Sequence, residues 1–193
     1  GSEMCIRDRC GTAFAGCGNN ADSSKAESKA ESSSSQVEKM PETDEEWTQA
    51  MYDKAMVSYG NTSMMQNVIK KAQSGEKVTV AYLGGSITEG ISAGADGCYA
   101  KLTYDYFAQK FGTGDNVQYV NAGLSGTPSK LGILRLDRDV LAYEPDICFI
   151  EFAVNDGTET DYQNAYESIV RTLLQKNITP VLLFSVTEND HSC

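Results

Sequence analysis

The sequence has little of what several classes of protein require. It holds a single histidine, His191. It has 16 lysines and arginines but 27 aspartates and glutamates, so its net charge is −11. This balance argues against nucleic-acid partners, which need basic stripes, and against a surface that seeks anionic lipid. No stretch approaches the roughly 20 apolar residues of a membrane span.

The cysteines also exclude two kinds of site. Of the six, three fall at positions 5, 10 and 17, one lies inside an apolar run, and no Cys-x-x-Cys pair occurs. The spacing therefore indicates neither a disulfide framework nor a zinc site. A chain of 193 residues with 40% apolar content is long enough for one domain with one core.

Residues 1–40 are not expected to belong to the fold. Residues 4–8 read Met-Cys-Ile-Arg-Asp, which looks like the translation of a transposon adapter used in shotgun sequencing, so we expect the gene to have been cut upstream. From residue 18 onward the segment is mostly Ser, Ala, Lys and Glu, a composition typical of a flexible tether.

A possible anchor precedes this tether. Ala-Phe-Ala-Gly-Cys at 13–17 resembles a bacterial lipobox, in which a signal peptide is cut before a cysteine whose thiol then carries the lipid. We therefore expect Cys17 to be a lipid anchor and the protein to be extracytoplasmic, held at the cell membrane only by that lipid. The alternative is a stray cysteine in a disordered tail.

Residues 41–193 are predicted to form one α/β domain. A capping box from Thr43 to Glu46 predicts a helix to about Ser58, and a second helix should run from Asn61 or Thr62 to a stop at Gly75, both with faces packed in the core. Apolar runs then alternate with helix-length segments. The runs span 78–83, 117–121, 147–154 and 180–186, and the helical segments span 99–111, 129–143 and 162–176. Because the runs are continuously apolar, the pattern predicts a three-layer parallel sheet with helices on both faces.

Glycines and polar residues follow three of these strands. Ser86 stands in a Gly-Gly-Ser turn after the first, Gly123 and Gly126 follow the second, and Asn155 with Asp156 follows the third. A nucleophile, a backbone N–H and an amide donor at one sheet edge are what acyl transfer needs. Taken singly, each has a plainer reading as a turn, a loop or a helix cap. A phosphate-binding loop is disfavoured because the first turn has no lysine.

Together the three segments resemble the first three motif blocks of the SGNH (GDSL-type) hydrolases. The blocks are Gly-Gly-Ser-Ile-Thr at 84–88, Asn-Ala-Gly-Leu-Ser-Gly at 121–126 and Val-Asn-Asp at 154–156, and the likeness runs from about Asn61 to the end. The first block has Gly-Gly-Ser where the family has Gly-Asp-Ser.

The resemblance implies a flavodoxin-like fold and a serine esterase or acylhydrolase that works through an acyl-enzyme without a cofactor or metal. Ser86 would be the nucleophile. The oxyanion hole would be formed by the N–H groups of Ser86 and Gly126 and the side chain of Asn155. Gly126 is preferred to Gly123 because the family's glycine follows the strand-end Asn at this larger offset. Substrates in this family are small-molecule or carbohydrate esters, often acylated carbohydrates.

The family's acid and base lie in a fourth motif, Asp-x-x-His. Glu188 and His191 match its spacing, but the acid differs and the pair follows the fourth strand too closely. We therefore interpret His191 as a tail residue and expect the catalytic Asp and His beyond Cys193, which makes the domain C-terminally incomplete. The alternative function is a non-catalytic cell-surface binding module with the same fold.

Overall fold

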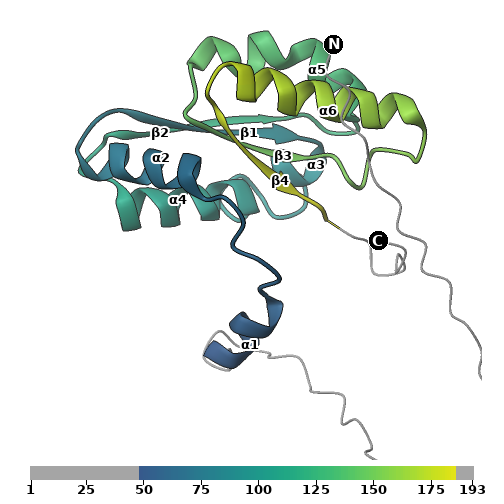
Figure 1. The fold of residues 1–193 in the computed structure, drawn as a ribbon. Helices are drawn as coiled ribbons and strands as arrows, with labels where there is room; N and C mark the ends of the chain where they lie inside the picture. The colour runs from purple at the N-terminus through teal and green to yellow at the C-terminus, as the bar shows by residue number, and fades with distance from the viewer. Residues whose placement is uncertain (1–47, 186–193) are drawn as a thin grey trace, which may run out of the picture. The chain divides into compact units, whose positions relative to one another are not determined.

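A computed structural model of the protein describes residues 48–185 (Figure 1). Contacts divide the chain into two units, Gly1–Asp53 and Lys54–Cys193. The adapter-like segment, Cys17, the tether, the capping box, Glu188 and His191 lie outside the described residues. No described helix has the length and apolar character needed to cross a membrane.

Four parallel strands form the sheet, in the order β2-β1-β3-β4. Their bounds are Val78–Gly84 for β1, Val117–Gly123 for β2, Ile147–Glu151 for β3 and Thr179–Leu183 for β4. Helices α2 (Ser63–Gln73) and α4 (Tyr99–Phe111) cover one face, and α5 (Ser129–Asp139) and α6 (Thr160–Gln175) cover the other (Figure 1). This arrangement confirms the predicted three-layer, flavodoxin-like parallel sheet.

Strand β1 lies at the centre of the sheet and is buried along its whole length. Val80 and Tyr82 pack on the face with α2 and α4, whereas Ala81 and Leu83 pack on the face with α5 and α6. Side chains of a strand alternate between faces, so a strand buried on both sides needs the continuous apolar run that the sequence shows. Burial also raises the pKa of the Cys148 thiol in β3 to about 12, which keeps it in the unreactive thiol form.

The predicted helix from residues 61 or 62 to 75 is confirmed as α2, with Val68 and Ala72 buried as expected. The prediction for the preceding helix is wrong in its packing. Helix α1 (Gln49–Ala55) ends before Ser58 and buries none of its residues. Met51 is half-buried and Ala55 is exposed. Seven residues give too short an apolar stripe to form a core of their own.

Several predicted boundaries differ from the observed ones by one to three residues, and two differences have a structural reason. Strand β3 ends at Glu151 rather than at residue 154, because the carbonyl of Phe152 accepts N–H groups from Asn155 and Asp156 at 2.9 and 2.8 Å and closes a turn. The segment 129–143 is divided at Val140 into α5 and a short 3₁₀ helix, η2 (Leu141–Tyr143).

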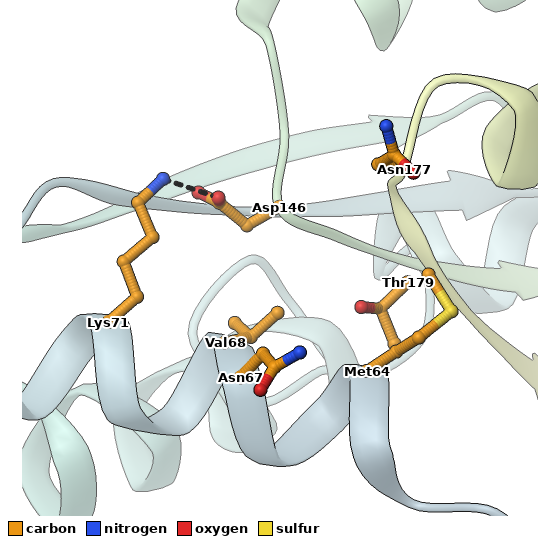
Figure 2. Close-up of a pocket in the computed structure, with 7 residues that line it drawn as sticks. All are labelled: Met64, Asn67, Val68, Lys71, Asp146, Asn177 and Thr179. Carbon is orange, nitrogen blue, oxygen red and sulfur yellow. Dashed lines mark hydrogen bonds and ion pairs between the residues drawn. The ribbon is translucent and has the colours of Figure 1, made fainter.

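The amino-terminal edge of the sheet carries a pocket of about 250 Å³ between α2 and the starts of β3 and β4 (Figure 2). At its side, the Lys71 Nζ lies 2.5 Å from the Asp146 Oδ1. The other carboxylate oxygen of Asp146 accepts the N–H of Thr79 at 2.9 Å. Asp146 therefore fastens α2 to the beginning of the two central strands.

Candidate active site

The carboxyl-terminal edge of the sheet gathers the loops that the sequence singled out. Gly84 at the end of β1 pairs in register with Gly123 of β2 and with Glu151 of β3. The loops that follow these three strands therefore leave the sheet at the same level. The chain crosses from one side of β1 to the other between β2 and β3, and ligands of open α/β sheets bind at such a point.

Ser86 stands at the first of these strand ends. The chain leaves β1 through Gly85 and forms α3 (Ser86–Glu89), a single turn of helix that the sequence analysis expected only as a turn. Ser86 is half-buried, and within the described residues its hydroxyl makes no hydrogen bond. Its N–H is the first of the helix and has no partner inside it. Both groups are therefore available to a ligand.

The loop after β2 brings Gly126 to the same edge. Gly126 is exposed and adopts a φ of +69°, a conformation that favours glycine. Across residues 48–185, no hydrogen bond from its N–H is found. The N–H of Gly123, in contrast, donates to Asn121 Oδ1 at 2.8 Å. Of the two glycines, only Gly126 offers a free donor.

Asn155 reaches this edge from the turn after β3. Its side-chain amide lies against Gly85, where an added Cβ would come within 2.3 Å of the Asn155 Oδ1. In the described part of the chain the Asn155 side chain has no hydrogen-bond partner. Glycine at position 85, where the family has Asp, thus leaves room for the amide beside Ser86.

Asp156 has a structural partner. A helix cap was the plainer reading of its segment in the sequence. The Asp156 Oδ1 accepts the N–H of Ser129 at 2.7 Å and so caps α5, the helix that precedes it in the chain. The bond joins the turn after β3 to the loop after β2. It supports the positions of Asn155 and Gly126 without using either donor.

A pocket of about 170 Å³ opens beside Ser86. Its other lining residues come from α3, from the loop after it and from the start of α4: Ile87, Gly90, Ser92, Ala93, Cys98 and Tyr99. The Tyr99 hydroxyl is 2.9 Å from the Thr88 Oγ1, and burial raises the pKa of Tyr99 far above its ordinary value. The lining contains no aspartate, glutamate, lysine, arginine or histidine, which suits a small neutral group.

The structure adds an arginine that the sequence analysis missed. Arg135 of α5 is buried, and its guanidinium donates to the carbonyls of Ala122 at 2.6 Å and Gly84 at 2.9 Å. It also lies 3.2 Å from Asp139. Hydrogen bonds from Arg138 and Arg135 hold the pKa of Asp139 below its usual range, so Asp139 remains a charged partner. The sequence signal that could have identified Arg135 was an arginine at a position of the helix where the spacing predicts burial.

Two glutamates at the same edge were missed as well. Glu89, at the end of α3, accepts the N–H of Ser125 at 2.6 Å. Glu151 is fully buried at the end of β3, where its Oε1 accepts the Ser185 hydroxyl. Its Oε2 has no partner among the described residues. A glutamate inside an otherwise apolar run was the sequence signal for Glu151.

The described structure thus brings Ser86, Gly126 and Asn155 to one edge of the sheet, while their catalytic roles stay predictions. A doubly wound parallel sheet with these three strand-end loops is the arrangement expected of an SGNH-type hydrolase. The family model of the GDSL-like lipase/acylhydrolases matches residues 82–192. The chain belongs to this family of ester hydrolases, which confirms the resemblance seen in the sequence.

Two solved structures similar to this chain are described with a substrate class, which the family model does not name. A two-domain esterase active on acetylated mannans, co-crystallised with mannopentaose, is 33% identical, with a TM-score of 0.60, over 69% of this chain and 37% of that one. A second structure of a two-domain esterase active on acetylated mannans, without the oligosaccharide, is also 33% identical. Its TM-score is 0.64, over 69% of this chain and 36% of that one. The chain therefore spans little more than a third of the length of these esterases. None of the curated proteins matches it.

Proposed function

We propose that the protein is a serine esterase that removes small acyl groups from acylated carbohydrate through an acyl-enzyme on Ser86. The observation that carries the proposal is the arrangement at the carboxyl-terminal edge. There a serine hydroxyl, a glycine N–H and an asparagine amide that have no partner among residues 48–185 lie at the ends of β1, β2 and β3.

The reaction assigns a role to each of these groups. The Ser86 oxygen attacks the ester carbonyl while its proton passes to a base that lies outside the described residues. The carbonyl oxygen gains negative charge, and the N–H groups of Ser86 and Gly126 and the amide of Asn155 donate to it. Collapse of the intermediate breaks the C–O bond to the sugar, which leaves with the proton. Water then attacks the acyl-enzyme, releases the acid and restores Ser86.

The substrate class rests on two observations. The esterase that shares 33% identity with this chain is described as active on acetylated mannans. The pocket beside Ser86 has a volume of about 170 Å³ and no aspartate, glutamate, lysine, arginine or histidine in its lining. An acetyl group on a carbohydrate of the mannan type fits both observations.

Acetate release tests this proposal. The product of the complete gene is incubated with 4-nitrophenyl acetate, 4-nitrophenyl decanoate, acetylated manno-oligosaccharides and the deacetylated oligosaccharides. We expect release of acetate from both acetylated substrates and little hydrolysis of the decanoate. Binding of both oligosaccharides without acetate release would instead identify the non-catalytic cell-surface module.

We also propose that Cys17 carries a lipid anchor that holds the protein on the outer side of the cell membrane. The support is the Ala-Phe-Ala-Gly-Cys sequence at 13–17 followed by a Ser-rich segment. Labelled palmitate fed to cells that express the complete gene should label the protein, and Cys17→Ala should abolish the label. Label that persists in Cys17→Ala, or no label in the wild type, would contradict the anchor.

A further inference from the structure

Glu89 joins the helix that carries Ser86 to the loop that carries Gly126. We infer that Glu89 is a positioning residue, whose carboxylate holds the Ser125–Gly126 turn so that the Gly126 N–H faces the reacting ester. The inference rests on the proposed function, because it concerns the same site. Glu89 acts through the loop and not by contact with the ester.

The geometry of α3 gives Glu89 this position. Glu89 is the last residue of a single helical turn that begins at Ser86. Its Oε2 accepts the N–H of Ser125 at 2.6 Å, and the next N–H along the chain belongs to Gly126. One short helix therefore carries both the proposed nucleophile and the carboxylate that fixes the neighbouring donor loop.

Other bonds at this junction stop short of Gly126. The Asn121 Nδ2 donates to the carbonyl of Thr88 at 2.8 Å. Gly123 packs so closely that an added Cβ would lie 2.2 Å from the backbone nitrogen of Glu89. The Leu124 N–H donates to Gly84 at 3.0 Å. These contacts fix the loop as far as residue 124, and the bond to Glu89 fixes the next residue.

Among residues 48–185 the N–H of Gly126 makes no hydrogen bond, so its direction depends on its neighbours. After Gly126, the Thr127 hydroxyl donates to the carbonyl of Leu124 at 2.6 Å and the Ser129 N–H donates to Asp156; before it, the support at Ser125 is the bond to Glu89. The positive φ of Gly126 and its lack of a side chain make the backbone permissive there. A carboxylate that accepts a backbone N–H makes a charge-assisted bond, roughly twice as strong as a neutral one. Ser125 is exposed, so water can replace the carboxylate when it is removed. We therefore expect removal to loosen the loop while the fold persists.

Three variants of the complete gene product separate positioning from other roles. Glu89→Ala removes the acceptor, and Glu89→Gln keeps an acceptor oxygen without the charge. Glu76→Ala is the matched control, because its carboxylate accepts the Ser74 hydroxyl at 2.8 Å and takes no part in the site. Circular dichroism checks the folding of each variant, and hydrolysis of 4-nitrophenyl acetate gives kcat and KM.

A small displacement of a catalytic donor can cost about 100-fold in rate, so Glu89→Ala should lower kcat by about 10- to 100-fold. We expect KM to change less than about 2-fold, since the donor acts mainly in the transition state. Glu89→Gln should restore kcat to within a few-fold of the wild type, and Glu76→Ala should have no effect. Amide exchange by NMR should show faster exchange at Ser125 in Glu89→Ala only.

The measurements distinguish a failure of the positioning role of Glu89 from a failure of the proposed function. An unchanged kcat in Glu89→Ala, or an equal loss of kcat in Glu89→Gln, overturns the positioning role while the proposed function stands. Unfolding of Glu89→Ala leaves the decision to Glu89→Gln, whose near-wild-type kcat and protected Ser125 amide support the role. A wild-type protein without esterase activity overturns the proposed function, and the positioning role of Glu89 in that reaction falls with it. Amide exchange at Ser125 still reports the bond to Glu89.

Discussion

The two edges of the sheet use polar side chains in opposite ways. At the amino-terminal edge, one carboxylate oxygen of Asp146 lies 2.5 Å from the Lys71 Nζ (Figure 2), and the other accepts the N–H of Thr79 at 2.9 Å. At the carboxyl-terminal edge, the described residues leave the hydroxyl of Ser86 and the amide of Asn155 without a partner. Both edges have a pocket, so a cavity by itself does not distinguish them.

The difference between the two edges indicates which of them can bind and convert a substrate. A polar group that is already paired stabilises the fold, whereas one held in place without a partner can offer its bond to a ligand. The supporting residues follow the same rule at the carboxyl-terminal edge. Asp156 and Arg135 are paired and hold the loops, and the groups that they support stay free. Substitutions at the two edges should therefore affect different measurable quantities.

The largest effect is expected at Ser86. Ser86→Ala should lower kcat/KM for 4-nitrophenyl acetate by roughly 10⁴-fold or more, because the nucleophile and its base act as a unit. Ser74→Ala, in a serine that donates to the Lys71 carbonyl at 2.8 Å, should leave activity unchanged. Equal activity of wild type and Ser86→Ala would remove the distinction between the edges.

Asn155 should come next. Asn155→Ala should lower kcat by about 100- to 1,000-fold, the usual cost of losing one oxyanion donor. The control is Asn67→Ala, in an exposed asparagine of the amino-terminal pocket. Steady-state kinetics of both variants measure the contrast, and a loss below about 3-fold in Asn155→Ala would show that its amide does not hold the oxyanion.

Gly85 provides a finer test of the same donor. A Cβ at this position would lie 2.3 Å from the Asn155 Oδ1, so Gly85→Ala must push the amide aside. We expect kcat to fall by about 10- to 100-fold, because the amide shifts and is not deleted. The double variant with Asn155→Ala should be no slower than Asn155→Ala alone. Additive losses would mean that Gly85→Ala acts elsewhere.

Asp146 should show the smallest effect on catalysis. Asp146→Ala removes the partner of Lys71 and of the Thr79 N–H, and the free energy of unfolding should fall by about 1–3 kcal/mol. Urea unfolding measures this loss, and kcat should stay at the wild-type value where the variant is folded. Asp146→Asn, which keeps an acceptor for Thr79, should lose less stability. A large fall in kcat of folded Asp146→Ala would couple the two edges.

Much of the fold could be predicted because its strands are continuous apolar runs. The segments 78–83 and 117–121 became β1 and β2 with only a few more residues, and the predicted helix over 99–111 matches α4. Parallel topology then brings the ends of successive strands to one edge, so residues far apart in sequence could be expected near each other. Ser86, Gly126 and Asn155 follow from that rule.

What the sequence could not show depends on tertiary pairing. Helix α3 has four residues, too few for any periodic pattern. The bond from Ser125 to Glu89 joins residues 36 apart, and the bond from Arg135 to Gly84 joins residues 51 apart, with no local signal for either. Phe152 continues the apolar run of β3, so hydropathy alone placed the end of the strand too late. The face of α1 was predicted wrongly because seven residues are too few to bury an apolar stripe by themselves.

The central claim is that Ser86 forms a covalent bond to the acyl group, and one measurement tests it directly. The complete gene product is treated with a fluorophosphonate, which reacts with activated serine nucleophiles, and its peptides are analysed by mass spectrometry. We predict one adduct, on Ser86, that is absent in Ser86→Ala and reduced in Asn155→Ala. An esterase-active protein whose adduct lies on another serine, or whose Ser86→Ala variant is labelled as fast as the wild type, would contradict the account.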